Sequence, residues 1–132
     1  MLRFFRQLVG GFATSEDGVT LPVVAITLLA LLAATGSAID IGRAELVQAK
    51  LSSSLDAAGL AVGATISTTD PTALAQNYLN VNFPSGYLGA TVTNMTVTMN
   101  QDNTVITLTA SANVPNTIMK IFGFNNTTVT AS

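Results

Sequence analysis

An uncharged run of twenty-two residues, GVTLPVVAITLLALLAATGSAI, stands out in the pattern of hydrophobic and polar positions along the chain. It occupies residues 18–39, between Asp17 and Asp40. About 20 apolar residues in a helix cross a hydrocarbon core of about 30 Å, and Pro22 falls in the first expected turn, where its missing N–H has little effect. A buried helix in a globular core is the alternative, but the remaining chain is too small and too polar to surround one. We therefore expect a transmembrane helix over residues 18–41.

The helical pattern continues without interruption beyond this run, to about residue 66. Apolar residues recur there at steps of three and four, so they share one helical face: Ala44, Val47, Leu51, Leu55, Ala58, Val62 and Ile66. We expect an amphipathic stalk over residues 42–66 that continues the transmembrane helix. Gly59 and Gly63 have a spacing that lets two helices approach closely, and they suit packing of the stalk against a sheet equally well.

The rest of the chain, residues 67–132, contains two further helical signals. Asp70 is a suitable N-cap and Pro71 a suitable first residue for a short helix that extends to about Val81. A helical turn is also predicted over residues 118–122, because a glycine follows directly and ends it.

Three segments in this region alternate between apolar and polar residues, which is typical of half-buried strands: residues 91–99, 104–114 and 127–131. A turn at residues 100–103 makes the first two segments a hairpin. A three-stranded sheet needs a cover on its apolar face, and the amphipathic stalk supplies one. The sequence therefore predicts a pilin-like α+β fold, in which a long N-terminal helix packs on a three-stranded antiparallel sheet and residues 67–132 form a small α+β domain.

Charges on the two sides of the apolar run predict an orientation. Arg3 and Arg6 precede the run. The first four charged residues that follow it sum to zero: Asp40, Arg43, Glu45 and Lys50. Because basic residues favour the cytoplasmic side of a span, we expect residues 1–17 in the cytoplasm and the C-terminal domain in the periplasm. A cleaved secretory signal is the alternative, since residues 34–38 are small, but the apolar region of such a signal is normally shorter.

The composition argues against catalysis and against nucleic-acid binding. Only 9% of residues are charged, and the formal net charge of −2 does not suit nucleic acid. The chain has no cysteine and no histidine, so thiolate chemistry and the commonest general base are absent. From residue 67 onward the only charged residues are Asp70, Asp102 and Lys120, and the two acids suit a helix cap and a turn. We expect no enzyme, no catalytic residue, no cofactor or metal site and no small-molecule substrate.

Asp40 ends the apolar run, and Arg43 lies three residues farther on, so the two side chains can pair on one helical face. One interpretation of Asp40 is a charge that marks the membrane boundary. The other is recognition of a neighbouring subunit's helix. The residues alone leave both interpretations open.

Two short motifs give the chain a resemblance to a known family. The first is AIDIGRA at residues 38–44, and the second is LDAAGLA at residues 55–61. Together with the apolar run, they resemble the N-terminal module of TadE/TadG-like Flp (tight-adherence) pilus-assembly proteins. The resemblance implies family-motif or interaction roles for Asp40, Gly42, Arg43, Ala44, Asp56, Ala57 and Ala58.

Two departures from the family pattern bear on the kind of member. TadE-like members carry a glutamate five residues after the processing glycine; counted from Gly18, this position is Val23, so the likeness is nearer the TadG-like side. TadG-like proteins often continue into a large von Willebrand-type domain, and this chain ends before one. Gly11 and Phe12, with Glu16, resemble a prepilin peptidase site, but acidic and polar residues then precede the span, so we expect no cut after Gly11 or Gly18.

The resemblance implies a single-pass protein of a bacterial inner membrane, which serves Flp-type pilus or related secretion-apparatus assembly as a structural or accessory component. Its expected partners are the lipid bilayer and other pilus-assembly proteins. The alternative is a minor pilin or pseudopilin that packs by its N-terminal helix into a filament. A solute-binding lipoprotein is disfavoured, because the chain has no cysteine for lipidation.

Overall fold

The computed structural model of the chain describes residues 17–65, 70–102 and 105–132. Several predictions lie outside these residues: the N-terminal segment with Arg3, Arg6 and the Gly11–Glu16 sequence, the stalk residue Ile66, the last residue of the predicted turn, 103, and the first residue of the second predicted strand, 104.

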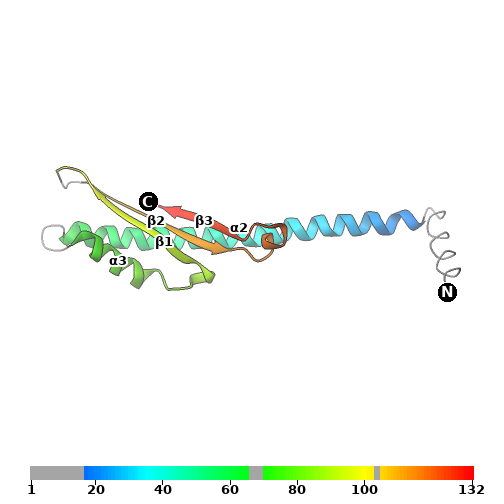
Figure 1. Cartoon of the computed structure of the whole chain (residues 1–132), viewed down its shortest axis with the longest axis horizontal. Helices are drawn as coiled ribbons and strands as arrows, with labels where there is room; N and C mark the ends of the chain where they lie inside the picture. The colour runs from blue at the N-terminus through cyan, green and yellow to red at the C-terminus, as the bar shows by residue number, and fades with distance from the viewer. Residues whose placement is uncertain (1–16, 66–69, 103–104) are drawn as a thin grey trace. The chain divides into compact units, whose positions relative to one another are not determined.

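The described elements form an α+β fold (Figure 1). They are the long helix α2 (Asp17–Thr65), helix α3 (Pro71–Asn82), the 3₁₀ turn η1 (Tyr87–Gly89), strands β1 (Thr91–Met99) and β2 (Ile106–Pro115), the 3₁₀ turn η2 (Met119–Phe122) and strand β3 (Asn126–Ala131). The predicted fold class, a long N-terminal helix with a three-stranded antiparallel sheet, is confirmed.

The chain divides into two compact units, Met1–Gly36 and Ser37–Ser132, and the division falls within α2. In the first unit the large apolar side chains of α2 are exposed, with Leu21 at 70% and Ile26 at 72%. Among the described residues, α2 is the one helix long and apolar enough to cross a membrane. We predicted Pro22 in the first turn of the helix. Because α2 begins at Asp17, Pro22 lies in its second turn, so this prediction is wrong.

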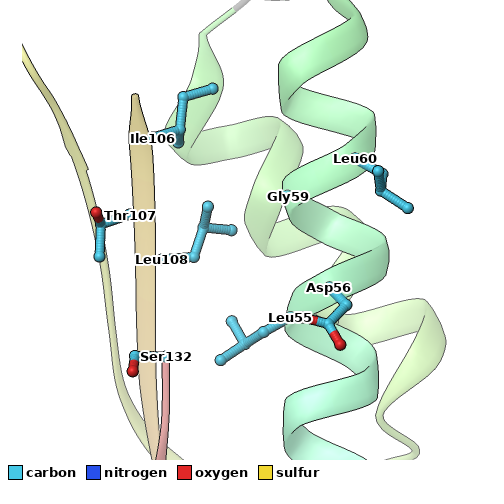
Figure 2. Close-up of a pocket in the computed structure, with 8 residues that line it drawn as sticks. All are labelled: Leu55, Asp56, Gly59, Leu60, Ile106, Thr107, Leu108 and Ser132. Atoms are coloured by element: carbon cyan, nitrogen blue, oxygen red, sulfur yellow. The ribbon is translucent and has the colours of Figure 1, made fainter. Parts of the chain in front are cut away.

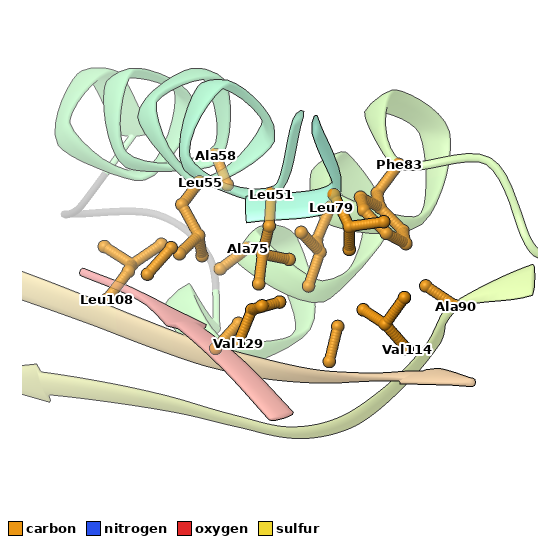
Figure 3. Close-up of a cluster of buried hydrophobic side chains, with 14 of the residues drawn as sticks. Leu51, Leu55, Ala58, Ala75, Leu79, Phe83, Ala90, Leu108, Val114 and Val129 are labelled. Atoms are coloured by element: carbon orange, nitrogen blue, oxygen red, sulfur yellow. The ribbon is translucent and has the colours of Figure 1, made fainter. Parts of the chain in front are cut away.

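In the second unit α2 contributes one apolar face to the core. The buried residues of this face are Ala44, Val47, Leu51, Leu55, Ala58 and Val62, which are the predicted face apart from Ile66. Figure 3 shows Leu51 and Leu55 directed at β2 and β3, with Leu79 of α3 placed beside them. The periodicity of three and four residues therefore identified the core-facing side of this helix correctly.

The sheet has the order β1-β2-β3, and both pairs of neighbouring strands are antiparallel. One face contributes six residues to the core: Leu108, Ala110, Ala112, Val114, Val129 and Ala131. The threonines between these positions, such as Thr107 and Thr130, lie on the opposite, exposed face. β3 has six residues and β2 has ten, so β3 pairs only with residues 110–115 of β2.

Helix α3 starts where the sequence predicted. The side chain of Asp70 accepts N–H groups from Thr72 at 2.9 Å and Ala73 at 3.4 Å, and Pro71 is the first helical residue. Two buried residues, Ala75 and Leu79, attach α3 to the core. A carboxylate at this position satisfies N–H groups that have no partner within the helix.

Candidate functional site

The carboxylate of Asp40 is buried and binds a loop far away in the sequence. Only 2% of the residue is exposed. Oδ1 accepts the N–H of Thr117 at 2.9 Å, and Oδ2 accepts those of Ile118 and Met119, both at 2.8 Å. Asp40 thus holds the segment between β2 and η2 against the helix.

The local structure explains why this segment offers three N–H groups in a row. β2 ends at Pro115 and η2 begins at Met119, so the N–H groups at the start of this turn have no acceptor within it. An ionised carboxylate is a strong acceptor for such groups and is favoured at the start of a helical turn. Asp40 therefore caps η2 from another element.

Arg43 lies one helical turn beyond Asp40 and bonds to two loops at once. Nη1 donates to Thr117 Oγ1 at 2.6 Å, and Nη2 donates to the carbonyl of Leu88 at 2.7 Å. Nη1 also lies 3.9 Å from Asp40 Oδ1, so the predicted pair on one helical face is present. Arg43 consequently joins the η1 loop and the loop after β2 to the same turn of α2.

The η1 loop adopts a left-handed backbone where it meets Arg43. Leu88 has φ +50°, a region that costs a residue with a side chain roughly 1–2 kcal/mol. Gly89 has φ +78°, and a Cβ atom there would lie 3.2 Å from Pro115 Cγ and 3.6 Å from Arg43 Nη2. The hydrogen bond from Arg43 to the Leu88 carbonyl offsets part of this strain, and the close approach requires glycine at position 89.

Asn116 closes the loop between β2 and β3. It is buried, its Nδ2 donates to the carbonyl of Phe124 at 3.0 Å, and its Oδ1 accepts from Thr127 Oγ1 at 2.9 Å. Its backbone N–H donates to the carbonyl of Asn125 at 2.9 Å. These bonds shape the loop whose first N–H groups Asp40 accepts.

The pKa of Asp40 lies below its ordinary value of 3.8. The largest cause is the N–H of Met119, followed by that of Thr117, because both stabilise the ionised form. Removal of the carboxylate from water acts in the opposite direction, and the N–H of Ile118 and the positive charge of Arg43 lower the pKa further. Asp40 is therefore held in its charged form at neutral pH.

The structure brings only part of the predicted residue set together. Asp40 and Arg43 form the cluster just described, which we call the Asp40–Arg43 cluster, with Thr117–Met119 and the carbonyl of Leu88. Ala44 and Ala58 lie in the hydrophobic core. Gly42 is exposed, and a Cβ atom added there would meet nothing within 4 Å.

Asp56 and Ala57 lie apart from this cluster. Asp56 is exposed and borders an open groove between α2 and β2, which Leu55, Gly59, Leu60, Ile106, Leu108 and Ser132 also line (Figure 2). Ala57 is half-buried. A Cβ atom at Gly59 would lie an ordinary 3.8 Å from Leu108 Cδ1, so packing on the sheet does not require glycine there.

The cluster is suited to holding loops, and not to bond-breaking chemistry. Asp40 is engaged by three N–H groups, and Arg43 by a hydroxyl and a carbonyl oxygen. Across residues 17–65, 70–102 and 105–132, no group of three or more acidic, histidine or cysteine side chains could hold a metal ion.

The two residues of the cluster that lie on α2, Asp40 and Arg43, fall within a segment that matches a protein-family model. Residues 18–65 match the family model described as putative Flp pilus-assembly TadE/G-like. The resemblance inferred from the AIDIGRA and LDAAGLA motifs is thereby confirmed, since both lie inside the matched segment. The model covers TadE-like and TadG-like proteins together, so the expected TadG-like character stays a prediction. No curated protein and no solved structure gives a significant match to the chain.

The TadE/G-like segment contains Asp40 and Arg43 but not the groups that they bind. Leu88 and Thr117–Met119 lie after residue 65. Sequence reasoning missed these partners, together with Asn116 and Gly89. The one available signal was the pair of an acid and an arginine on one turn directly after the apolar run.

Proposed function

We propose that this chain is a membrane-anchored structural component of an Flp-type pilus or related secretion-apparatus assembly system, in a bacterial inner membrane. The observation that carries the proposal is that the TadE/G-like segment is one continuous helix with two environments. Its first part exposes large apolar side chains, and one face of its second part packs against the chain's own sheet and α3.

The exposed first part is best explained by lipid. Leu21, Ile26 and Leu29 are 70%, 72% and 67% exposed. Apolar surface gains about 25 cal/mol per Å² when it leaves water, so this many exposed side chains would be unfavourable in solution. We propose that the span ends before Asp40, two residues earlier than the 18–41 expected from the sequence, because Asp40 is bonded to the folded unit that starts at Ser37.

In this proposal the protein works by holding and by binding. The span anchors it, the second half of α2 supports the sheet, and the Asp40–Arg43 cluster fixes two loops of the folded unit to the helix just after the span. Partners among the pilus-assembly proteins would meet exposed motif positions such as Gly42 and Asp56.

The proposed orientation is a cytoplasmic N-terminus and a periplasmic folded unit, because Arg3 and Arg6 flank the span on one side. A single cysteine at Asn103 should react with a membrane-impermeant maleimide once the outer membrane is permeabilised. A cysteine at Leu2 should stay unlabelled in intact inner membranes. Labelling of the cysteine at Leu2, without labelling of the cysteine at Asn103, would show that the orientation is the opposite one.

The main test separates this proposal from a minor pilin or pseudopilin. The same exposed apolar helix would also suit the interior of a filament. The amount of protein in the inner-membrane fraction must therefore be compared with the amount in sheared filaments. We expect the protein in detergent-extracted inner membranes, where it co-purifies with other pilus-assembly proteins. Recovery in sheared filaments, with depletion from the membrane, would support the pilin alternative.

A further inference from the structure

The loop that Asp40 holds carries large apolar side chains that face outward. Within four residues, Ile121 is 78% exposed, Phe122 is 53% exposed and Phe124 is 61% exposed. Lys120, also exposed, precedes them, and the segment 116–126 contains no acidic residue. We call residues 118–125 the η2 loop. Two exposed phenylalanines beside an isoleucine are an unusual grouping on a domain surface rich in threonine and asparagine.

The η2 loop is fixed next to the start of the folded unit. The N–H groups of Ile118 and Met119 bond to Asp40, and Thr117 bonds to both Asp40 and Arg43. In Figure 1 the loop, coloured orange, lies beside the cyan part of α2. Asp40 directly follows the uncharged run, and the helix exposes Ile39 at this same end.

We propose that the η2 loop inserts Ile121, Phe122 and Phe124 into the lipid surface where α2 leaves the bilayer. This inference rests on the proposed membrane anchoring. In the proposed arrangement the chain enters the bilayer through the residues just before Asp40, so a loop whose backbone is bonded to Asp40 lies near the depth of the headgroups. The ammonium group of Lys120 complements lipid phosphates there, as basic and aromatic residues do at membrane surfaces.

Lipid explains these features better than a second protein. The exposed apolar side chains belong to a loop that is bonded to Asp40, the residue directly after the uncharged run, and the one charged residue among residues 118–125 is Lys120. The loop is also held by two bonds from Ile118 and Met119 to Asp40 and by the bond from Asn116 to the Phe124 carbonyl, and Thr117 directly before it bonds to Asp40 and Arg43, so its side chains are presented without a large entropy cost.

The test uses the absence of tryptophan from the natural chain, which gives each introduced tryptophan a clean fluorescence signal. Full-length Phe122→Trp and Phe124→Trp are reconstituted in vesicles of phosphatidylcholine and phosphatidylglycerol, with bromine atoms near the headgroups or deep in the chains. Both sites are exposed, so the substitutions leave the core packing unchanged. Leu28→Trp reports on the span. Val105→Trp is the matched control. Val105 directly precedes β2, and the ten residues of this strand place it about 30 Å from the strand end that leads to the η2 loop.

We expect both loop tryptophans to lose fluorescence with shallow bromines and to resist iodide in the buffer, while Val105→Trp shows the reverse. If Leu28→Trp is quenched by deep bromines but the loop tryptophans are not, the protein is anchored and the loop proposal is overturned. Quenching of the loop tryptophans by iodide would then show that the loop lies in water. Resistance of these tryptophans to both iodide and brominated lipid would show that another protein covers them. If Leu28→Trp is not quenched by any brominated lipid, the anchoring itself fails.

Discussion

Asp40 and Met119 are 79 residues apart in the sequence, and Asp40 Oδ2 accepts the N–H of Met119 at 2.8 Å. This bond joins the helix turn after the apolar run to the loop between β2 and β3. Two further N–H groups of the same loop and the side chain of Arg43 converge on this carboxylate. The first motif of the TadE/G-like segment therefore has a structural role within this chain.

Loss of the Asp40 carboxylate should destabilise the folded unit. Asp40→Ala removes the acceptor of three N–H groups and leaves them unsatisfied, so we expect a lower Tm and faster protease cleavage in detergent. Asp40→Asn keeps one acceptor oxygen and should have a smaller effect. Asp56→Asn alters an exposed acid on the same helix and should behave like the parent. An Asp40→Ala protein as stable as the parent would show that these bonds contribute nothing.

The contribution of Asp40 should depend on pH in a defined direction. Its pKa is lowered in the folded protein, so the ionised form is favoured by folding. The stabilisation is therefore fully present above the ordinary value of 3.8 and is lost as the pH falls through the lower pKa of the folded state. We expect the difference in unfolding free energy between the parent and Asp40→Asn to be constant near neutral pH and to shrink below about pH 3.8. A difference that does not change in acid would contradict this assignment.

The core face of α2 predicts a clear contrast between two leucines. Leu55 is 4% exposed and faces Leu108 across the groove in Figure 2, whereas Leu60 is 77% exposed. Leu55→Ala should lower the unfolding free energy by about 2–5 kcal/mol, as measured by denaturant titration in detergent. Leu60→Ala should change it by less than about 0.5 kcal/mol. Leu55→Asp should insert into the membrane and then be degraded, and resistance to protease equal to the parent would exclude this face from the core.

Local patterns were sufficient for α2, α3 and the three strands, and for the side of α2 that faces the core. Spacings of three and four identified the buried face from Ala44 to Val62, alternation identified the strands, and Asp70 with Pro71 identified the start of α3. These features depend on residues near one another in the sequence, so periodicity and capping rules apply to them.

The cluster around Asp40 could not be predicted in the same way. Its partners are backbone N–H groups, and every residue except proline has one, so nothing in the letters at 117–119 marks them as partners of an acid. The left-handed backbone of Leu88 is also hidden, because leucine rarely adopts it. The sequence indicated that Asp40 and Arg43 can pair. Their bonds to Leu88 and to residues 117–119 join segments far apart in the sequence, so the tertiary structure is needed to identify them.

Two glycines should respond in opposite directions to the same substitution. Gly89→Ala places a Cβ atom at φ +78° and 3.2 Å from Pro115 Cγ, so we expect a loss of roughly 1–3 kcal/mol. Gly42→Ala lies inside α2 with nothing within 4 Å of the new atom, so helix propensity should stabilise the protein by up to about 1 kcal/mol. Denaturant titration of both variants checks the signs. Equal effects would show that the η1 loop moves freely to accept a side chain.

The final prediction concerns the N-terminus of the mature protein. Gly11 and Phe12, with Glu16, resemble a prepilin peptidase site, but a prepilin continues from such a site as an unbroken apolar helix. Here Asp17 and a glycine follow before the span, and a second acid raises the free energy of drawing this end toward lipid. These acids instead come at the N-terminal end of α2, whose first residue is Asp17, and negative charge is favoured at such an end. We therefore expect no cut after Gly11 or Gly18.

Intact mass of the detergent-extracted protein from its native host decides the matter. The uncut chain has a mass of 13.6 kDa, apart from any loss of Met1. Gly11→Ala, which should block a peptidase at that site, serves as the matched control and should give the same processing state as the parent. A mature chain that begins at Phe12 or Val19 would contradict the prediction. Such a cut would favour the pseudopilin alternative, because removal of the N-terminal basic residues Arg3 and Arg6 frees the helix to leave the membrane for a filament.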